Sequence, residues 1–324
     1  MNILKTLIVN KLETRKLISI LTPTFNEEDN VEFLISKVEE QIIKFPQYDF
    51  EHVFVDNASV DSTVEILRKI SYEKKHVKVI VNAKNFGHIR SHFHAFLECK
   101  GDAVINLVAD FQDPIELISE FILKWENGNK LVLGIKKSSK ENKLMFFIRS
   151  TFYNILSKVS DTENLLRNFT GFGLYDKTFL DVLRKLDDPY PYFRGLISEF
   201  GYDVFTIEYS QPKRRAGITK NNFFTLYDMA MLGFTNHSKL PLRLAAFIGF
   251  FSAIISFFVA VGYFVYKLMY WDTFQAGTAP MVIGVFFFSS VQLFFIGIIG
   301  EYIGAIHTHV RKRPYVVERE RINY

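Results

Sequence analysis

Two long stretches without a charged residue lie in the C-terminal third of this chain, and they restrict its fold more than any other feature. Leu244–Tyr266 and Thr273–Gly300 contain no Asp, Glu, Lys or Arg. Each includes a run close to the ~20 apolar residues with which an α-helix crosses a bilayer. Tyr and Trp residues bracket the runs, as is common at membrane interfaces. The pair predicts a transmembrane hairpin, in preference to a buried hairpin of a soluble protein.

Basic residues flank the predicted hairpin on both sides. Lys239 and Arg243 precede the first run, and Arg311, Lys312 and Arg313 follow the second. Because Lys and Arg gather on the cytoplasmic side of membrane proteins, we expect residues 1–240 and both chain ends to be cytoplasmic, at the cell (inner) membrane. The expected division is a lead-in at 1–16, a globular domain at 17–220, a juxtamembrane segment at 221–243, two spans within 244–306 (about 244–268 and 280–303), and a cytoplasmic tail at 307–324.

Charge and cysteine content exclude other classes of protein. Lys and Arg number 39 against 35 Asp and Glu, a net charge of +4, which argues against a nucleic-acid binder with its concentrated basic face. The single cysteine, Cys99, excludes an internal disulfide and fits a reducing compartment. The N-terminal lead-in has too short an apolar run for a signal peptide. We therefore expect the lipid bilayer, and not nucleic acid, as a partner.

Strand and helix patterns alternate through residues 17–134 and predict an α/β fold. Short apolar runs predict strands at 17–21, 52–56, 77–81, 103–108 and 130–134. Helices are predicted from about Glu27 and at 61–70, 88–99 and 115–126. Strands that are apolar throughout are typical of a mostly parallel sheet covered on both faces. Ligands of such sheets bind beyond the carboxyl ends of the strands.

Polar clusters stand at four of these strand ends, in the stretches 22–28, 56–63, 82–88 and 109–116. Each is weak alone, because the residues from Asp61 could cap a helix and those from Asn26 could start one. Neither G-x-G-x-x-G nor a P-loop motif is present. A nucleotide would therefore have to be held by side chains and by a metal ion.

Taken in order, the clusters give the sequence a family resemblance. PTFNEED (23–29), VDNASVDST (55–63), NFGH (85–88) and ADFQDP (109–114) resemble the family-2 glycosyltransferases of the GT-A fold. RRAGITK (214–220), the two predicted spans and GEYIG…RKRPYVV are similar to the polyprenyl-phosphate glycosyltransferases of that family. These are the bactoprenol glucosyltransferases, with dolichyl-phosphate mannose synthase as a more distant relative. The resemblance implies a GT-A nucleotide-sugar-binding domain followed by a C-terminal two-helix transmembrane hairpin.

The same resemblance implies a reaction. It is the inverting transfer of a sugar from a UDP- or GDP-sugar to polyprenyl (undecaprenyl) phosphate at the cytoplasmic membrane face, for cell-envelope glycan or lipid modification. A non-catalytic membrane scaffold derived from the fold, or a transferase with another lipid acceptor, is the alternative. A processive polysaccharide synthase is disfavoured, because no Q-x-x-R-W motif is present. Assembly into a homo-oligomer is left open.

Positions that match the family motifs carry the implied roles in donor binding. Nucleotide-sugar contacts fall on Pro23, Asn26, Glu27, Asp56 and Asp110. Asp110 and Gln112 would also coordinate Mg²⁺ or Mn²⁺ on the diphosphate of the donor. Asn57 stands where the family often has a second Asp.

One position departs from the family pattern, because Val108 stands where the first Asp of the D-x-D element is expected. If the strand end stays extended, residues 108, 110 and 112 share one face and Asp113 faces the other. Asp110 and Gln112 would still offer two oxygens, and a hard cation that keeps water and phosphate ligands can be held by so few. The substitution puts the metal affinity in question. Alternatively, Asp110 and Asp113 cap the helix after Pro114.

The acceptor chemistry needs cations and no general base, because a lipid phosphate is already ionised at neutral pH. The resemblance places the lipid-phosphate contacts on Lys136, Arg149, Arg215, Thr219 and Lys220. The expected catalytic residues are Asp110, Gln112 and Arg215. The stretch 143–160 has apolar residues at helical spacing and would lie at the membrane interface, unless it packs in the core. The basic loop 212–220 could also simply attract anionic lipid.

Two further features carry less specific predictions. Phe169–Asp176 resembles the acceptor-side loop of the family, and Gly171 and Gly173 suggest a tight, mobile turn there. The spacing of His88, His92 and His94 would be compatible with a zinc site, but we find no carboxylate or cysteine at ligand spacing from them. We therefore expect those histidines to belong to a helix surface.

Overall fold

The computed structural model describes residues 15–138, 166, 168–191, 193–212, 215, 240–270, 278–311 and 313–324. The chain divides into two units, of which one holds the globular domain together with residues 312–324 and the other holds two long helices. The predicted contacts at Arg149, Thr219 and Lys220 lie outside the described residues, as do the stretch 143–160 and most of the juxtamembrane segment.

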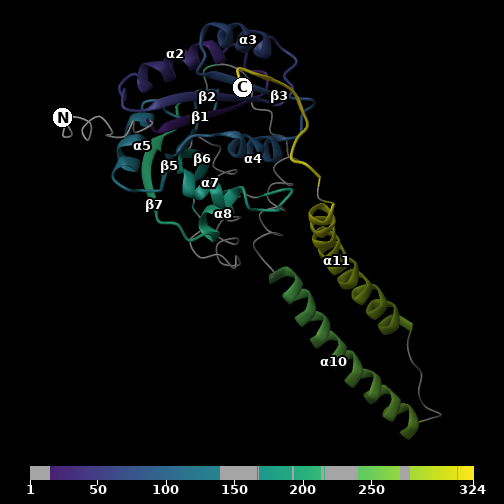
Figure 1. The fold of residues 1–324 in the computed structure, drawn as a ribbon. Helices are drawn as coiled ribbons and strands as arrows, with labels where there is room; N and C mark the ends of the chain where they lie inside the picture. The colour runs from purple at the N-terminus through teal and green to yellow at the C-terminus, as the bar shows by residue number, and fades with distance from the viewer. Residues whose placement is uncertain are drawn as a thin grey trace, which may run out of the picture. The chain divides into compact units, whose positions relative to one another are not determined.

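The globular unit is built on an eight-stranded sheet in the order β7-β5-β6-β4-β1-β2-β3-β8 (Figure 1). The strands are β1 (Leu17–Thr24), β2 (Asp49–Asp56), β3 (Val77–Asn82), β4 (Ala103–Asn106), β5 (Leu131–Ser138), β6 (Phe169–Asp176), β7 (Val204–Ser210) and β8 (Glu318–Ile322). β1 pairs in parallel with β2 and β4, β2 with β3, and β5 with β7. The carboxyl ends of β1 to β4 therefore meet at one edge, and the predicted α/β fold with a mostly parallel sheet is confirmed.

Helices cover both faces of this sheet (Figure 1). They are α2 (Val31–Ile42), α3 (Thr63–Glu73), α4 (His88–Glu98), α5 (Leu117–Glu126), α7 (Lys177–Leu183) and α8 (Phe193–Glu199). On β2, Phe54 packs in one core cluster with residues of α2, α3 and α5, whereas Val53 and Val55 pack in the other with residues of α4, α7 and α8. Successive strand residues point to opposite faces, so an apolar run supplies both clusters at once.

The segment that we expected to be a mobile acceptor-side loop is strand β6, and that prediction is wrong. β6 runs antiparallel to both β4 and β5, with Gly173 opposite Asn106 and Leu133. A Cβ on Gly173 would lie 2.6 Å from the carbonyl oxygen of Val132, which is closer than Cβ atoms come to atoms of a neighbouring strand. The glycine that suggested a turn instead permits close contact between neighbouring strands.

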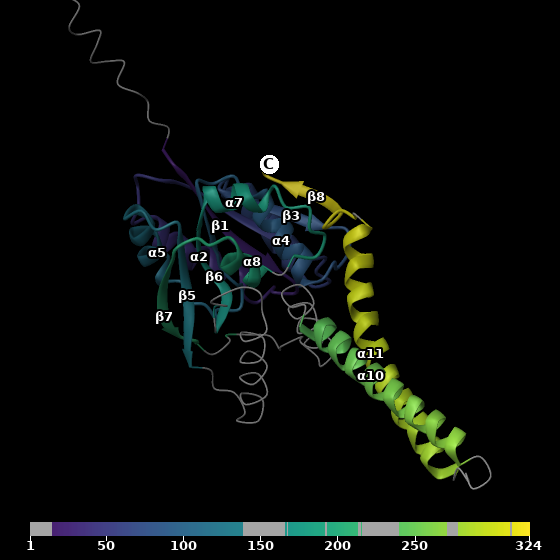
Figure 2. The same ribbon diagram turned by 90° about the horizontal axis from the view of Figure 1, so that it is seen from below.

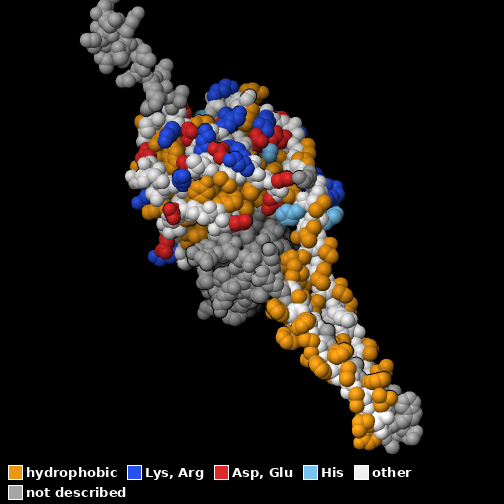
Figure 3. Space-filling view, turned by 60° about the horizontal axis from the view of Figure 1, so that its bottom comes forward, with side chains coloured by type: hydrophobic (Ala, Val, Ile, Leu, Met, Phe, Trp, Pro, Cys, Tyr) orange, Lys and Arg blue, Asp and Glu red, His pale blue; other side chains and the backbone are white. Residues whose placement is uncertain are grey.

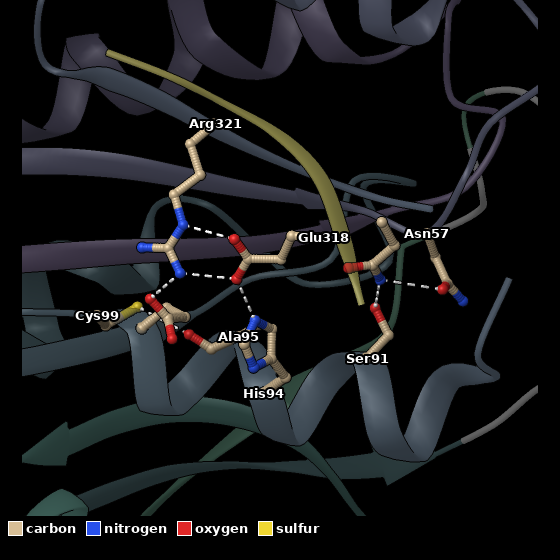
Figure 4. Close-up of polar contacts among 9 residues, drawn as sticks. Asn57, Ser91, His94, Ala95, Cys99, Glu318 and Arg321 are labelled. Atoms are coloured by element: carbon tan, nitrogen blue, oxygen red, sulfur yellow. Dashed lines mark hydrogen bonds and ion pairs between the residues drawn. The ribbon is translucent and has the colours of Figure 1, made fainter. Parts of the chain in front are cut away.

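The end of the chain is not the separate tail that we expected at 307–324. β8 pairs antiparallel with β3 and forms one edge of the sheet (Figure 2). Arg321 binds Glu318 and reaches Glu98 on α4 at 2.8 Å. His94 of the same helix lies 2.8 Å from Glu318 (Figure 4). The run ERERI resembles a solvated tail because it is charged, but charged side chains are normal on edge strands.

The second unit contains α10 (Leu240–Met269) and α11 (Thr278–Val310). Leu244–Tyr266 and Gly284–Val310 have mean hydropathies of 2.5 and 1.7, and neither stretch is buried inside the protein. Apolar side chains cover both helices (Figure 3). A core helix of a soluble protein would be buried, so these two exposed apolar helices are compatible with a membrane protein.

Candidate active site

The loops that follow β1 and β2 are bonded to each other through side chains. Asn26 has a left-handed φ of 55°, which Asn accepts more readily than most residues. Its backbone N–H donates to Ser59 Oγ at 2.8 Å, and its Oδ1 accepts from Val60 N at 2.9 Å. Glu27 N donates to Thr63 Oγ1 at 2.8 Å. These bonds fix Asn26 and Glu27, two predicted nucleotide contacts, at the carboxyl edge of the sheet.

Asp61 acts both at a helix start and between the loops. Its Oδ1 accepts from Thr63 N at 3.1 Å, at the first residue of α3. Its Oδ2 accepts from Glu28 N at 3.3 Å. Glu28 in turn accepts from Ser62 N at 2.9 Å. The N-cap residue of α3, Ser62, makes no side-chain cap bond, so Asp61 bonds the helix start from one residue further back, and the carboxylates of Asp61 and Glu28 hold the two loops together.

Asp56, the last residue of β2, is fully buried. Its Oδ2 accepts from Ser59 N at 2.8 Å, and its Oδ1 accepts from the hydroxyls of Ser59 and Thr24. Burial raises the pKa of Asp56, and the hydrogen bonds from Ser59 oppose that shift. The carboxylate thus shapes the turn after β2, and its contact with a base or ribose stays a prediction. Pro23, another predicted contact, pairs with Val55 on the neighbouring strand.

Asparagines join the ends of β2 and β3 to α4 (Figure 4). Asn57 Oδ1 accepts from Asn82 Nδ2 at 3.2 Å and from Phe86 N at 3.0 Å, while its Nδ2 donates to Asn85 Oδ1 at 2.9 Å. Asn82 Nδ2 also donates to Ser91 Oγ on α4 at 3.0 Å. An amide both donates and accepts, which an Asp at position 57 could not do. No role was predicted for these asparagines, although their position at the ends of two strands is a signal that the sequence contains.

The chain after β4 does not stay extended, and our expectation of alternating faces at 108, 110 and 112 is wrong. β4 ends at Asn106, and Phe111 has a left-handed φ of 62°. Asp110 Oδ1 accepts from Gln112 N at 3.1 Å, which is the side-chain turn that Asp commonly makes with the backbone two residues later. We call residues 107–113 the Asp110 turn.

Asp113 points away from solvent beneath this turn. It is 3% exposed, accepts from Tyr209 OH at 3.0 Å, and accepts from Val108 N at 3.4 Å. Burial raises the pKa of Asp113 to about 6, against hydrogen bonds and the charge of Lys136, which lower it. α5 begins at Leu117 without a side-chain cap. The alternative in which Asp110 and Asp113 cap this helix is therefore wrong.

The oxygen atoms of the Asp110 turn fit a hard divalent cation. Asp110 offers a carboxylate and Gln112 an amide oxygen, and both side chains are partly exposed. Such oxygen ligands suit Mg²⁺ or Mn²⁺, which retain water and phosphate ligands. Val108 has no oxygen in its side chain, and the Asp113 carboxylate is held in the core by Tyr209. The donor set is therefore limited to Asp110 and Gln112 among the residues of this turn.

Two of the predicted cations lie at the same turn. Arg215 N donates to Asp110 O at 3.4 Å, and its Nη1 donates to Asp29 O at 3.1 Å. Lys136, near the end of β5, is close enough for its charge to lower the pKa of Asp113. The fold thus brings Arg215, Lys136 and the expected metal ligands together from distant parts of the sequence.

Histidines of α4 make structural contacts. His92 Nε2 lies 2.8 Å from Asn106 Oδ1, and Asn106 donates to the carbonyl oxygen of Gly171 at 2.8 Å. Our statement that no carboxylate lies at ligand spacing is wrong for His94, whose ring nitrogen lies within 4.8 Å of oxygens of Glu98 and Glu318. Arg321 already binds both carboxylates, so this cluster fastens β8 to α4.

Comparisons with known proteins identify the family. Residues 19–184 match the family model described as Glycosyl transferase family 2. The chain is 31% identical over 304 residues to the SfII prophage-derived bactoprenol glucosyl transferase of Shigella flexneri, covering 93% of this chain and 97% of that protein. The chain belongs to glycosyltransferase family 2. An uncharacterized glycosyltransferase of Bacillus subtilis (strain 168), YkcC, is 32% identical and covers 93% of each chain.

Family membership makes this chain a glycosyltransferase with the GT-A fold. Among solved structures, glucosyl-3-phosphoglycerate synthase from Mycobacterium tuberculosis, in complex with Mn²⁺, UDP and phosphoglyceric acid, is similar at a TM-score of 0.47. It is 17% identical and covers 68% of this glycosyltransferase and 76% of its own chain. The Asp110 turn lies at the carboxyl edge of the parallel strands, where ligands of such sheets bind.

Proposed function

We propose that this glycosyltransferase transfers a sugar from a UDP- or GDP-sugar to polyprenyl phosphate, with inversion at the anomeric carbon. The observation that carries the proposal is the meeting of Arg215 with the Asp110 turn. A cation and hard oxygen ligands at the carboxyl edge of the sheet suit a diphosphate leaving group, because both offset its negative charge. The relative from Shigella flexneri is named a bactoprenol glucosyl transferase, which supports polyprenyl phosphate as the acceptor.

Donor binding would use the loops after β1, β2 and β4. Pro23, Asn26, Glu27 and Asp56 would line the nucleotide pocket, and Asp110 and Gln112 would hold Mg²⁺ or Mn²⁺. The metal would supply positive charge to the departing diphosphate. Because the loops after β1 and β2 are already bonded to each other, the pocket needs little ordering before it binds the donor.

Acceptor binding would rest on cations. Lys136, Arg149, Arg215, Thr219 and Lys220 would hold the lipid phosphate beside the anomeric carbon. A phosphate is ionised at neutral pH, so it attacks without a general base, and catalysis reduces to positioning and charge stabilisation. Asp113 is buried and is not needed as a base.

The two exposed apolar helices suit a membrane-bound acceptor. α10 and α11 would cross the membrane, with the globular unit and both chain ends on the cytoplasmic side, as the flanking Lys and Arg residues favour. The globular unit would then meet a lipid phosphate at the same membrane that holds the enzyme.

A screen of donors tests the proposal. Full-length enzyme in detergent is incubated with undecaprenyl phosphate and a panel of UDP- and GDP-sugars, with and without EDTA, and the lipid products are identified by mass spectrometry. We expect one donor to yield a polyprenyl-phosphate-linked sugar and EDTA to suppress its formation. If no donor is consumed or hydrolysed under any condition, the proposal is wrong and the scaffold alternative is favoured.

A further inference from the structure

Arg215 lies on two aromatic rings. Its guanidinium carbon is 4.2 Å from the ring centroid of Phe33 and 5.7 Å from that of Phe111. The two rings are 5.3 Å apart and tilted by 44°. Arg stacks on aromatic faces and is attracted by their negative charge distribution. The rings and the Asp29 carbonyl oxygen together surround the guanidinium group.

The placement of Phe33 is not explained by packing against the sheet. α2 buries its neighbours Val31, Leu34 and Ile35 against the core, whereas Phe33 is 40% exposed. A large apolar side chain on the outer face of a helix contributes little to the core. Its ring instead lies under the one described residue of the stretch 213–220.

Phe111 reaches the same place through the shape of the Asp110 turn. The Asp110–Gln112 hydrogen bond accompanies the left-handed φ of Phe111, a backbone conformation that is unfavourable for a bulky residue. The Phe111 ring packs partly against the core and contacts Phe33. Arg215 is therefore tied to this turn twice, through the Phe111 ring and through its backbone bond to Asp110.

We propose that Phe33 is a positioning residue for the transfer reaction: with Phe111 it forms an aromatic seat that holds the Arg215 guanidinium against the Asp110 turn. The role in transfer rests on the proposed function, whereas the seat itself does not. A cation–π contact at a partly exposed site changes an equilibrium by about two- to five-fold. Loss of the Phe33 ring should raise the population in which the Arg215 side chain has left the seat by a factor of that size.

A second cation on the Phe33 ring provides a matched control. The Lys37 ammonium lies 5.5 Å from the ring centroid and is paired with Glu40 at 2.7 Å. Lys37→Met removes a cation from the same ring without touching Arg215. Phe33→Leu removes the ring but keeps an apolar side chain, and Phe33→Trp keeps an aromatic face.

Limited trypsin digestion tests the seat without requiring activity. Arg215 is a trypsin cleavage site, and cleavage after it in the full chain is followed by mass spectrometry. Trypsin must take up the Arg215 side chain, so this cleavage follows the population in which the side chain has left the rings, and Phe33→Leu should speed it by about two- to five-fold. Phe33→Trp and Lys37→Met should match the wild type, with equal thermal unfolding in all variants. Equal rates of cleavage after Arg215 in Phe33→Leu and Lys37→Met would overturn the seat.

A double-mutant cycle then tests the role in transfer. Phe33→Leu should raise the KM for polyprenyl phosphate or lower kcat by about two- to five-fold when Arg215 is present. In the Arg215→Gln background the same substitution should have no further effect, because the guanidinium group that Phe33 contacts has been removed. A persisting effect would show that Phe33 acts elsewhere and would contradict the positioning role. Faster cleavage after Arg215 in Phe33→Leu, in a protein that transfers no sugar, would support the seat and refute the proposed function.

Discussion

Replacing Tyr209 by Phe removes one oxygen atom from the core beneath the Asp110 turn. Tyr209 is 6% exposed and its hydroxyl donates to Asp113 Oδ1 at 3.0 Å. The other bond to this carboxylate, from Val108 N, is longer at 3.4 Å. The substitution therefore leaves a buried carboxylate without its better donor while the ring packing is kept.

The expected cost follows from that loss. A buried group left without its hydrogen bond costs about 1–3 kcal/mol, and more when it is charged. For a domain of this size each kcal/mol lowers the unfolding temperature by about 2–4 °C. We expect Tyr209→Phe to unfold about 2–12 °C below the wild type.

The pH dependence has a definite sign. Burial raises the pKa of Asp113 to about 6, above the ~3.9 of an unfolded chain. Between these values the folded state holds the proton more tightly, so the stability contributed by Asp113 is full at lower pH and is lost as pH rises to about 6. The Tyr209 bond lowers the pKa of Asp113 by favouring its ionised form. Tyr209→Phe should therefore cost more at about pH 7.5 than at about pH 5.

Thermal unfolding of the detergent-solubilised protein at both pH values measures this effect. Tyr202→Phe is the matched control, because its hydroxyl donates to Thr178 O at 3.2 Å in an exposed position and its loss should cost about 0.5 kcal/mol or less. Tyr209→Phe unfolding within about 1 °C of the wild type at both pH values would refute the reasoning.

Two further substitutions test the strands that the sequence did not predict. Gly173→Ala would place a Cβ 2.6 Å from Val132 O, and the backbone must shift at a cost of about 1–3 kcal/mol; an unchanged unfolding temperature would contradict this. Arg321→Met leaves the carboxylates of Glu98 and Glu318 facing each other, so hydrogen exchange at β8 should quicken. The effect should shrink in high salt, and equal exchange rates at low salt would argue against this contact.

The strands and helices of the N-terminal half could be predicted because each is a short apolar run or an amphipathic stretch. β1 to β4 and the helices between them follow that pattern. β6 was missed because Gly171 and Gly173 suggest a turn. The sequence does not show that the neighbouring strand β5 lies so close to Gly173 that a glycine is needed there. β8 was missed because its ERERI sequence is charged, and only its partners on α4 show why.

The identities of the candidate site residues could be predicted from the sequence better than the conformation of the backbone that carries them. The motifs indicated Asn26, Glu27, Asp110 and Arg215, and the structure brings them to one edge of the sheet; their roles in binding stay predictions. The conformation of the Asp110 turn was not predictable from alternation, because a local side-chain bond overrides the extended chain. The aromatic contacts of Arg215 join residues far apart in the sequence, and no local pattern encodes such a contact.

Sugar transfer by Asp110→Asn tests the central claim most directly. Asn can still accept the bond from Gln112 N that shapes the turn, so the fold is kept while the charge is removed. Asp49→Asn, an exposed residue at the opposite end of β2, is the control. We predict that formation of polyprenyl-phosphate-linked sugar falls by about 100-fold or more in Asp110→Asn and is unchanged in Asp49→Asn. Wild-type rates in Asp110→Asn would contradict the assignment of the active site to the Asp110 turn.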